Sequence, residues 1–441
     1  MRKLLLGGAA CVAALAMGGA VQAATVYESA STGYPAQAPV TTPKPGELVV
    51  NIDLRINTYV EGDWNSGQNG GAAPNNVNGL GSKASPLGIA GYGRLYAGVS
   101  GKTTTGINYG LFWEIRQDFS PNTGSATDLS SGVSSESGKG TLFWFYNYAY
   151  IGTDQLGTMR LGQTDGPPGL FLVGAFDDYG TGGWNGDLPV GFGPIWPWPD
   201  TGDYQESAKI VYLSPSLAGF DFGVGYEPNA ASMTDGLFNQ NLVSTSDLAT
   251  DLSRRKNTIE GALRYKGAFG PLGVATSFLA MYGGHVLPGP LNSGMNGKTD
   301  FDNFELKDAG LALTVAGLTF GGNYLWGQFN GTGATKPAGQ PNPYAWIGGT
   351  EYAIGPLLVG AAYYQYQYPG TVGAVTQRRD SGVQLGFNYN LAPGIQVLGD
   401  YLWGNSRQNA VTATGVSPSA VPGSRFYQQE QAIGVGLQLR W

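Results

Sequence analysis

The sequence predicts an all-β protein, a sixteen-stranded antiparallel β-barrel that crosses a membrane. Three observations lead to this class: an amphipathic last strand, an alternation of short and long connections, and a composition rich in strand and turn formers. The last strand ends on Trp441, and apolar side chains precede it at every second position. Successive residues of a strand face opposite sides, so this strand has one apolar and one polar face. The apolar face carries Ile433, Val435, Leu437 and Leu439, and the polar face carries Glu430, Gln438 and Arg440.

The N-terminus has the features of an export signal. Arg2 and Lys3 precede an apolar stretch over residues 4–17, and a small-residue cleavage site follows at 21–23. The stretch of about 14 apolar residues is shorter than the ~20 that a helix needs to span a bilayer. We therefore expect residues 1–23 to be a signal peptide that is removed on export.

Composition excludes several other classes. The chain has 72 Gly, 25 Tyr, 18 Phe and 10 Trp, and only 12% of its residues are charged, which favours strands and turns over helices. The single cysteine, Cys11, lies in the signal, so the mature chain has neither a disulfide nor a thiolate metal site. Removing Arg2 and Lys3 from the 24 basic residues leaves 22 against 31 acidic ones, a net charge of −9. Nucleic acid is therefore not an expected partner.

A leader and then sixteen strands follow the signal. Residues 24–47 are rich in Pro, Ala and Thr and predict an extended segment, so the barrel is expected over residues 48–441. Alternation of apolar and polar residues between turn signals predicts the strands. They span 48–60, 89–100, 106–119, 141–152, 157–164, 205–213, 219–227, 255–266, 272–282, 303–315, 318–328, 345–354, 357–367, 379–390, 395–404 and 426–441.

The connections between these strands are of two kinds. Seven are short turns, such as those at 101–105, 267–270 and 316–317, and the eight between them are long and polar. Because short and long connections alternate, all turns lie at one rim of the barrel and all long loops at the other. A soluble β-sandwich seldom keeps this order over so many strands.

Charge separates the two faces of each strand. In the strand 48–60, Ile52 and Leu54 share a charge-free face, while Asp53 and Arg55 take the other. An Arg or Lys facing lipid at the bilayer midplane costs ~2–4 kcal/mol, so the charged face should line the interior. Alternation fails over residues 143–148, where a bulge, lumen tyrosines or a subunit contact would each account for it. In the strand 255–266 the same rule sends Lys256, Glu260, Arg264 and Lys266 inward.

With these features the chain resembles the sixteen-stranded general porins of Gram-negative bacteria over most of the mature sequence. The resemblance is carried by the strand 157–163 before a long acidic third loop, by Tyr-x-Ser-Pro at 212–215 followed by Gly219 and Phe220, and by the terminal aromatic. Trp441 departs from the family, which usually ends on Phe, and the third loop lacks the family's Pro-Glu-Phe-type signature. The resemblance implies a bacterial outer-membrane protein and a homotrimer, in contact with outer-membrane lipid and lipopolysaccharide.

In such porins the third loop folds into the lumen and narrows it. The matching segment here, residues 165–204, is the longest connection and carries six aspartates without Lys or Arg. The resemblance implies that these acidic groups face basic groups on the wall, which creates a field that tunes ion selectivity without a chemical step. Solvation or turn capping is the alternative role for the aspartates. The expected acidic-loop residues are Asp165, Asp177, Asp178 and Asp187, and the expected basic-wall residues are Arg55, Arg94, Arg116 and Arg160.

The end of the third loop also contains Trp196 and Trp198, which predict either a sugar-stacking platform or packing of the loop against the wall. Catalysis is not expected, because the only histidine, His285, falls in a predicted external loop. Motifs for phosphate, zinc or calcium are absent from the sequence, so we expect no cofactor.

Three functional classes are open at this stage. The leading hypothesis is a general diffusion porin that passes ions and small hydrophilic solutes. The second is a substrate-selective channel for a carbohydrate or another small solute, which a track of loop tryptophans would favour. The third, a secreted soluble β-protein or lectin, is disfavoured by the alternating connections and the charge-free outer face.

Overall fold

The computed structural model describes residues 43–65, 86–118, 142–188, 190, 193–200, 207–230, 254–286, 300–371, 374, 376–414 and 417–441. The predicted signal peptide and all but the end of the predicted leader lie outside these residues, so both stay predictions. Among the described residues, no helix is long and apolar enough to cross a membrane.

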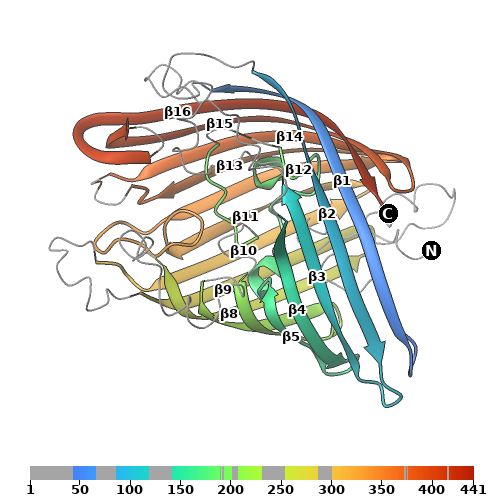
Figure 1. Ribbon diagram of the computed structural model, residues 1–441. Helices are drawn as coiled ribbons and strands as arrows, with labels where there is room; N and C mark the ends of the chain where they lie inside the picture. The colour runs from blue at the N-terminus through green and yellow to red at the C-terminus, as the bar shows by residue number, and fades with distance from the viewer. Residues whose placement is uncertain are drawn as a thin grey trace.

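Sixteen strands form one closed barrel in which each strand pairs antiparallel with its neighbours in sequence, as predicted (Figure 1). Strand β1 also pairs with β16, which closes the ring and leaves no free edge. The strands are β1 Leu48–Asn65, β2 Leu87–Lys102, β3 Asn108–Asp118, β4 Phe143–Thr153, β5 Gly157–Thr164, β6 Ser207–Leu213, β7 Phe220–Asn229, β8 Arg255–Phe269, β9 Leu272–His285, β10 Phe304–Val315, β11 Leu318–Gln328, β12 Tyr344–Ile354, β13 Leu357–Tyr368, β14 Arg378–Ala392, β15 Ile395–Thr414 and β16 Ser417–Arg440.

The largest departure from the predicted strands is at the last hairpin. The sequence predicts a long loop over residues 405–425, but β15 and β16 continue as a paired ladder in strands of 20 and 24 residues, as far as Thr414 opposite Ser417. The sequence over 411–414 has one Val and two Thr, which are residue types that favour strands. This hairpin extends beyond the neighbouring strands on the side of the long loops (Figure 1).

The last residue closes the barrel. The backbone N–H of Trp441 donates to the carbonyl oxygen of Leu54 at 3.0 Å, and the N–H of Leu54 donates to the carbonyl oxygen of Trp441 at 2.9 Å. Pairing continues from there, with Arg55 opposite Arg440 and Asn65 opposite Glu430. The terminal aromatic therefore belongs to the seam between the first and the last strand.

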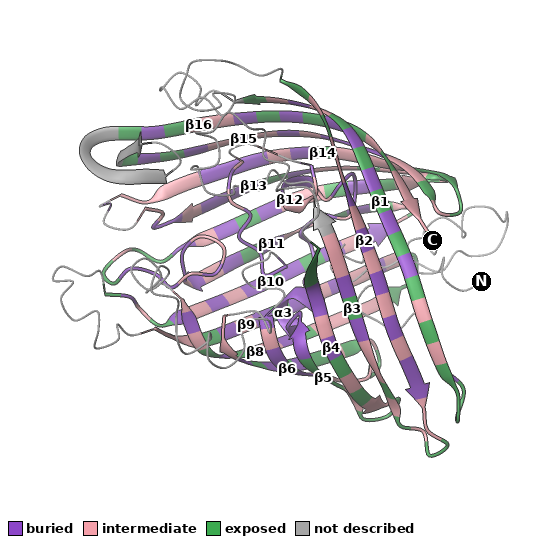
Figure 2. Cartoon of the chain, viewed as in Figure 1, coloured by how far each residue is buried: buried purple, intermediate pink, exposed green. Residues whose placement is uncertain are grey.

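Burial follows the predicted parity (Figure 2). In β1 the apolar Val50 and Ile52 are 63% and 67% exposed, whereas Asp53 and Arg55 are 8% and 6% exposed. Because the exposed parity is free of charge, it suits lipid, and the charged parity faces the interior.

Two bulges change the parity locally. The register between β3 and β4 shifts between Glu114 and Ile115 of β3, so Phe145 of β4 is an extra residue. Phe145 and Tyr146 are therefore both buried, while Trp144 is exposed. A bulge therefore explains the failed alternation over residues 143–148. In β8 the register shifts between Lys256 and Ile259. As a result the buried side chain at that end is Arg255, and the prediction of an inward Lys256 is wrong.

The segment between β5 and β6 contains two short helical turns, α3 Pro167–Leu170 and η7 Gly183–Asn185. Its side chains form the largest apolar cluster together with inward-facing side chains of β8–β16. We call the described residues 165–188, 190 and 193–200 the inner loop, because they lie inside the barrel wall (Figure 1). The core of the molecule is thus the contact between the inner loop and one side of the barrel.

Candidate functional site

Glycines on the inward face of the wall make room for the inner loop. A Cβ atom at Gly360 of β13 would lie 2.0 Å from the ring of Tyr179, and one at Gly310 of β10 would lie 1.9 Å from the carbonyl oxygen of Val173. Both distances are far inside van der Waals contact, so neither position tolerates a side chain while the loop stays in place. The backbone of the wall is therefore shaped to the loop.

Polar wall side chains satisfy the backbone of the loop. Gln384 Nε2 donates to the carbonyl oxygen of Phe176 at 2.6 Å, and the N–H of Thr181 donates to Asp400 Oδ2 at 2.6 Å. The N–H of Ile195 donates in the same way to an inward carboxylate of β14, at 2.9 Å. An irregular segment inside a barrel needs such partners, because its buried N–H and C=O groups are costly when unpaired. These contacts hold the inner loop against β14 and β15.

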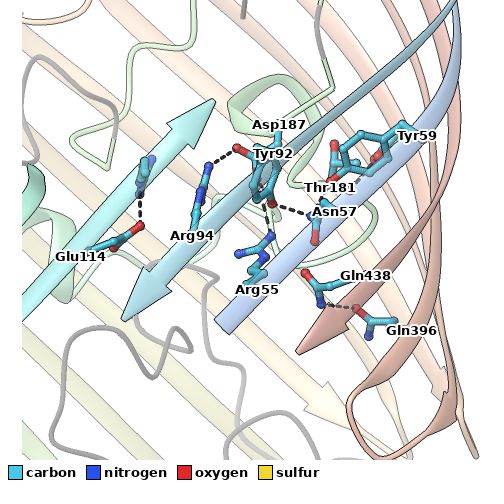
Figure 3. A network of polar contacts seen from close by, with 12 residues as sticks. Arg55, Asn57, Tyr59, Tyr92, Arg94, Glu114, Thr181, Asp187, Gln396 and Gln438 are labelled. Carbon is cyan, nitrogen blue, oxygen red and sulfur yellow. Dashed lines mark hydrogen bonds and ion pairs between the residues drawn. The ribbon is translucent and has the colours of Figure 1, made fainter. Parts of the chain in front are cut away.

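The tip of the inner loop reaches the wall formed by β1 and β2. Asp187 accepts a hydrogen bond from Arg94 Nη2 at 2.5 Å and one from the Tyr92 hydroxyl at 2.5 Å, and Arg55 Nη2 lies 3.5 Å from it (Figure 3). Burial would raise the pKa of Asp187, but the charges of Arg94 and Arg55 outweigh burial and lower this pKa below its ordinary value. The carboxylate is therefore ionised, and the two arginines and Asp187 together carry a net charge of +1.

Uncharged side chains of the same wall position this cluster. The Tyr92 ring lies against both guanidinium groups, with the Arg94 Cζ 4.2 Å and the Arg55 Cζ 5.4 Å from its centroid. The side-chain amide of Asn57 is hydrogen-bonded to the hydroxyls of Tyr59 and Tyr92 (Figure 3). We name Arg55, Asn57, Tyr59, Tyr92, Arg94 and Asp187 the latch cluster.

Sequence reasoning missed the three uncharged members of the latch cluster. Asn57 and Tyr59 share the inward parity of Arg55, and Tyr92 shares that of Arg94. Parity alone was enough to place them on the inner wall. It gave no sign that they contact the loop, because that contact depends on where the loop runs.

The other two predicted wall arginines have different neighbours. Arg116 Nε donates to Glu114 Oε1 at 2.6 Å, and its guanidinium lies 3.1 Å from the centroid of Phe145. The guanidinium of Arg160 lies 5.0 Å from the centroid of Tyr148. Both arginines are on the inward parity of β3 and β5, beside aromatic side chains, and their role at a constriction stays a prediction.

The predicted Asp165 and Asp177, and also Asp200, are buried apart from the latch cluster. Asp165 accepts a hydrogen bond from the Tyr146 hydroxyl at 3.0 Å. Asp177 and Asp200 both accept from Asn185 Nδ2, at 3.2 and 2.9 Å. Burial, followed by the charge of Asp177, raises the pKa of Asp200 well above its ordinary value.

Asp178 lies beside a carboxyl of the wall. Burial, followed by the charge of Glu351 in β12, raises the pKa of Asp178 well above its ordinary value. In the part of the chain that the structure describes, no three His, Cys, Asp or Glu residues are arranged to hold a metal ion. Placement of Asp165, Asp177 and Asp178 at a constriction stays a prediction.

The tryptophans of the inner loop pack against the wall. Trp196 and Trp198 are 4% and 0% exposed, with ring centroids 4.5 Å apart, and both meet the ring of Tyr364 edge-on. The indole Nε1 of Trp198 donates to Asn323 Oδ1 at 2.7 Å. Of the two roles predicted for these rings, packing is the one that this geometry fits.

Comparisons with known proteins agree with this architecture. A family model described as Gram-negative porin matches residues 9–409. An outer membrane porin protein of Bordetella pertussis is 26% identical over 247 residues, which cover 53% of this chain and 58% of that relative. The chain therefore matches less than two thirds of the length of this curated relative.

Solved structures share the fold at low sequence identity. The outer membrane channel DcaP of Acinetobacter baumannii matches with a TM-score of 0.53 at 11% identity, covering 91% of this chain and all of that chain. The OmpF complex of Salmonella typhi with daunomycin matches at 0.51 and 14%, covering 88% and 97%. An anion-selective porin from Comamonas acidovorans matches at 0.50 and 14%, covering 90% and 100%.

Proposed function

Because the chain belongs to the Gram-negative porin family and is a protein of the bacterial outer membrane, we propose that its barrel is a water-filled channel. Ions and small hydrophilic solutes diffuse passively through it, without a chemical step. The latch cluster is the observation that supports a water-filled channel. In it a carboxylate of the inner loop contacts arginines of β1 and β2 inside a closed barrel. Charged groups need water or a partner, and a polar lumen supplies both.

The inner loop divides the lumen unevenly. Its residues from Pro167 to Leu188 contact β7 to β16 and then, through Asp187, β1 and β2. We therefore place the passage on the side of β2–β6, where Arg94, Arg116 and Arg160 lie on inward parity. Solutes pass between this basic wall and the loop, and the charges within about a Debye length, ~8 Å at physiological salt, set ion preference.

Planar-bilayer recording of the purified protein tests the channel. For a general diffusion porin, single-channel conductance rises in proportion to bulk salt and is unaffected by sugars. Conductance that saturates, or that a sugar blocks in a saturable way, would instead identify the substrate-selective channel. Packing of Trp196 and Trp198 removes the feature that favoured this second function.

We propose that the protein assembles as a homotrimer through the outer face of β3 and β4. There the indole of Trp113 donates to Asn147 Oδ1 at 3.0 Å, and Trp144 meets Trp113 edge-on at 5.8 Å. An amide on the lipid-facing parity is costly in hydrocarbon, so contact with another subunit suits it better. Heat-dependent gel mobility and cross-linking test this assembly, and a monomer in native gels would contradict it.

A further inference from the structure

The bulge in β4 brings an extra side chain to the inner wall. The register shifts beside Glu114, and Phe145 and Tyr146 are both buried, at 9% and 3% exposure. Gln163 of β5 stabilises the bulge, because its Nε2 donates to the carbonyl oxygens of Phe145 at 2.8 Å and Trp144 at 3.3 Å. Bulges often re-aim a side chain beside a functional site, so the contacts of Phe145 indicate what this bulge does.

The ring of Phe145 holds the guanidinium of Arg116. The Arg116 Cζ lies over this ring, 3.1 Å from its centroid, in a cation–π contact. Arg116 Nε donates to Glu114 Oε1 at 2.6 Å, which fixes a second side of the group. A planar guanidinium that is held at one face and through Nε has little freedom to rotate. Its orientation is therefore set by Phe145 and Glu114.

The two Nη atoms are the open end of this guanidinium. In the part of the chain that the structure describes, neither Nη atom of Arg116 has a hydrogen-bond partner. The Arg116 side chain is 15% exposed, whereas those of Arg55 and Arg94 are 7% and 5% exposed. The latter two contact Asp187 instead. Arg116 is thus the most accessible of the three and has both Nη groups left for a solute.

The same bulge contacts the beginning of the inner loop. The hydroxyl of Tyr146 donates to Asp165 at 3.0 Å, and the Tyr146 ring meets Phe145 edge-on, with centroids 4.7 Å apart. The bulge therefore fixes Arg116 relative to the inner loop, on the side of the lumen where we place the passage. We name Glu114, Arg116, Phe145, Tyr146 and Gln163 the bulge cluster.

We propose that Phe145 is a positioning residue that turns the Nη edge of Arg116 towards the passage, where this edge selects planar oxyanions such as carboxylates over halides. This inference rests on the proposed function. Two parallel N–H groups match the two oxygens of a carboxylate, whereas a spherical chloride ion gains less from their planar arrangement. Glu114 offsets the charge of Arg116, so a carboxylate binds weakly and leaves again, as transport through a pore requires.

Bi-ionic reversal potentials of potassium acetate against KCl in planar bilayers test this selection. F145L keeps every charge but removes the ring under Arg116. Its permeability ratio of acetate to chloride should fall about threefold, which corresponds to the loss of one weak, partly exposed ion pair. The reversal potential in a KCl gradient should stay that of wild type, because the charges are the same. F145Y keeps the ring and should keep the wild-type ratio.

Two further variants separate the ring from the wall and the fork from the charge. F112L is the matched control: it also removes an inward ring of β3, but among the described residues no guanidinium lies over this ring, so the ratio should not change. R116K keeps the charge and loses the planar fork, so its ratio should fall as in F145L while the KCl reversal potential is unchanged. Heat-dependent gel mobility checks that each variant is folded, and F145M replaces F145L if F145L does not fold.

Failure of this inference and failure of the proposed function give different results. If the wild-type protein forms no conducting channel in KCl, the proposed function is wrong. If it conducts, an acetate-to-chloride ratio that F145L and R116K leave unchanged overturns the inference. An equal fall in F145L and F112L also overturns it, because loss of any ring from the wall would then explain the change.

Discussion

Replacing Asp187 by Asn should release the tip of the inner loop and shift ion preference towards anions. The carboxylate accepts hydrogen bonds from Arg94 and Tyr92, and its side chain is 19% exposed. Hydrogen bonds to a charged group contribute a net ~1.5–3 kcal/mol, so with this partial exposure we expect a loss of about 2 kcal/mol. A loss of that size raises the population of the released tip roughly 30-fold.

The electrostatic effect has a definite sign. In D187N the net charge of Arg55, Arg94 and residue 187 rises from +1 to +2, because the amide is neutral. We expect a reversal potential in a KCl gradient that moves towards that of chloride, and a larger single-channel conductance. The shift should shrink at high salt, because screening lengths fall to ~3 Å at 1 M.

Asp154→Asn is the matched control. Asp154 also pairs with a cation, Lys102 Nζ at 2.8 Å, but it lies in the turn between β4 and β5 and its side chain is 67% exposed. D154N removes the same charge and should leave both readouts unchanged. If D187N and D154N give the same reversal potential and conductance as wild type, the latch cluster does not border the passage, and the reasoning about its charge is wrong.

The other predictions concern the wall, the glycine contacts and the buried loop carboxyls. Alanine at Arg94 and Arg116 should raise cation preference, and an unchanged reversal potential would show that these arginines do not line the constriction. Leucine at Gly360 should expel the inner loop and raise conductance, whereas Gly261→Ala, a position with nothing within 4 Å, should not; equal conductances would contradict the docking argument. The pKa of Asp200 is raised in the docked loop, so the docked loop binds more protons than the released loop. Docking should therefore weaken as the pH rises from the ordinary carboxyl pKa to the raised pKa of Asp200. Hydrogen exchange of the loop amides, corrected for intrinsic rates, should therefore be slower at pH 5 than at pH 7.5 in wild type but not in D200N, and faster exchange at pH 5 would refute this.

The barrel was predictable because its rules are local. The period of two and the charge-free lipid face can be recognised within a single strand, and the connection lengths can be recognised along the chain. Two of the bulges could not be predicted from these rules. The bulges beside Glu114 and at Asn257 each add one residue, and a single inserted residue reverses which side chain faces inward. That is why Arg255 was overlooked and Lys256 was placed on the wrong side.

The path of the inner loop was not predictable from the loop itself. The sequence analysis singled out four of the six loop aspartates. Among the described ones, Asp187 contacts the arginines of β1 and β2, whereas Asp177 and Asp178 lie beside other carboxyls. The wall determines the path of the loop, because inward glycines such as Gly310 and Gly360 leave the space that the loop backbone and rings occupy. Without the strand register, nothing links these glycines to the loop.

Pairing of charge at the latch cluster also changes how selectivity should be understood. The acidity of the third loop suggested a strong field between a negative loop and a positive wall. Contact at 2.5 Å between Asp187 and Arg94 instead cancels charge locally, and the pair acts on a passing ion mainly as a dipole. Carboxyls whose pKa burial raises, such as Asp178 and Asp200, contribute less negative charge than a count of aspartates implies. The ion preference of the channel should therefore follow the small residual charge near Arg55 and Arg94, and not the net charge of the chain.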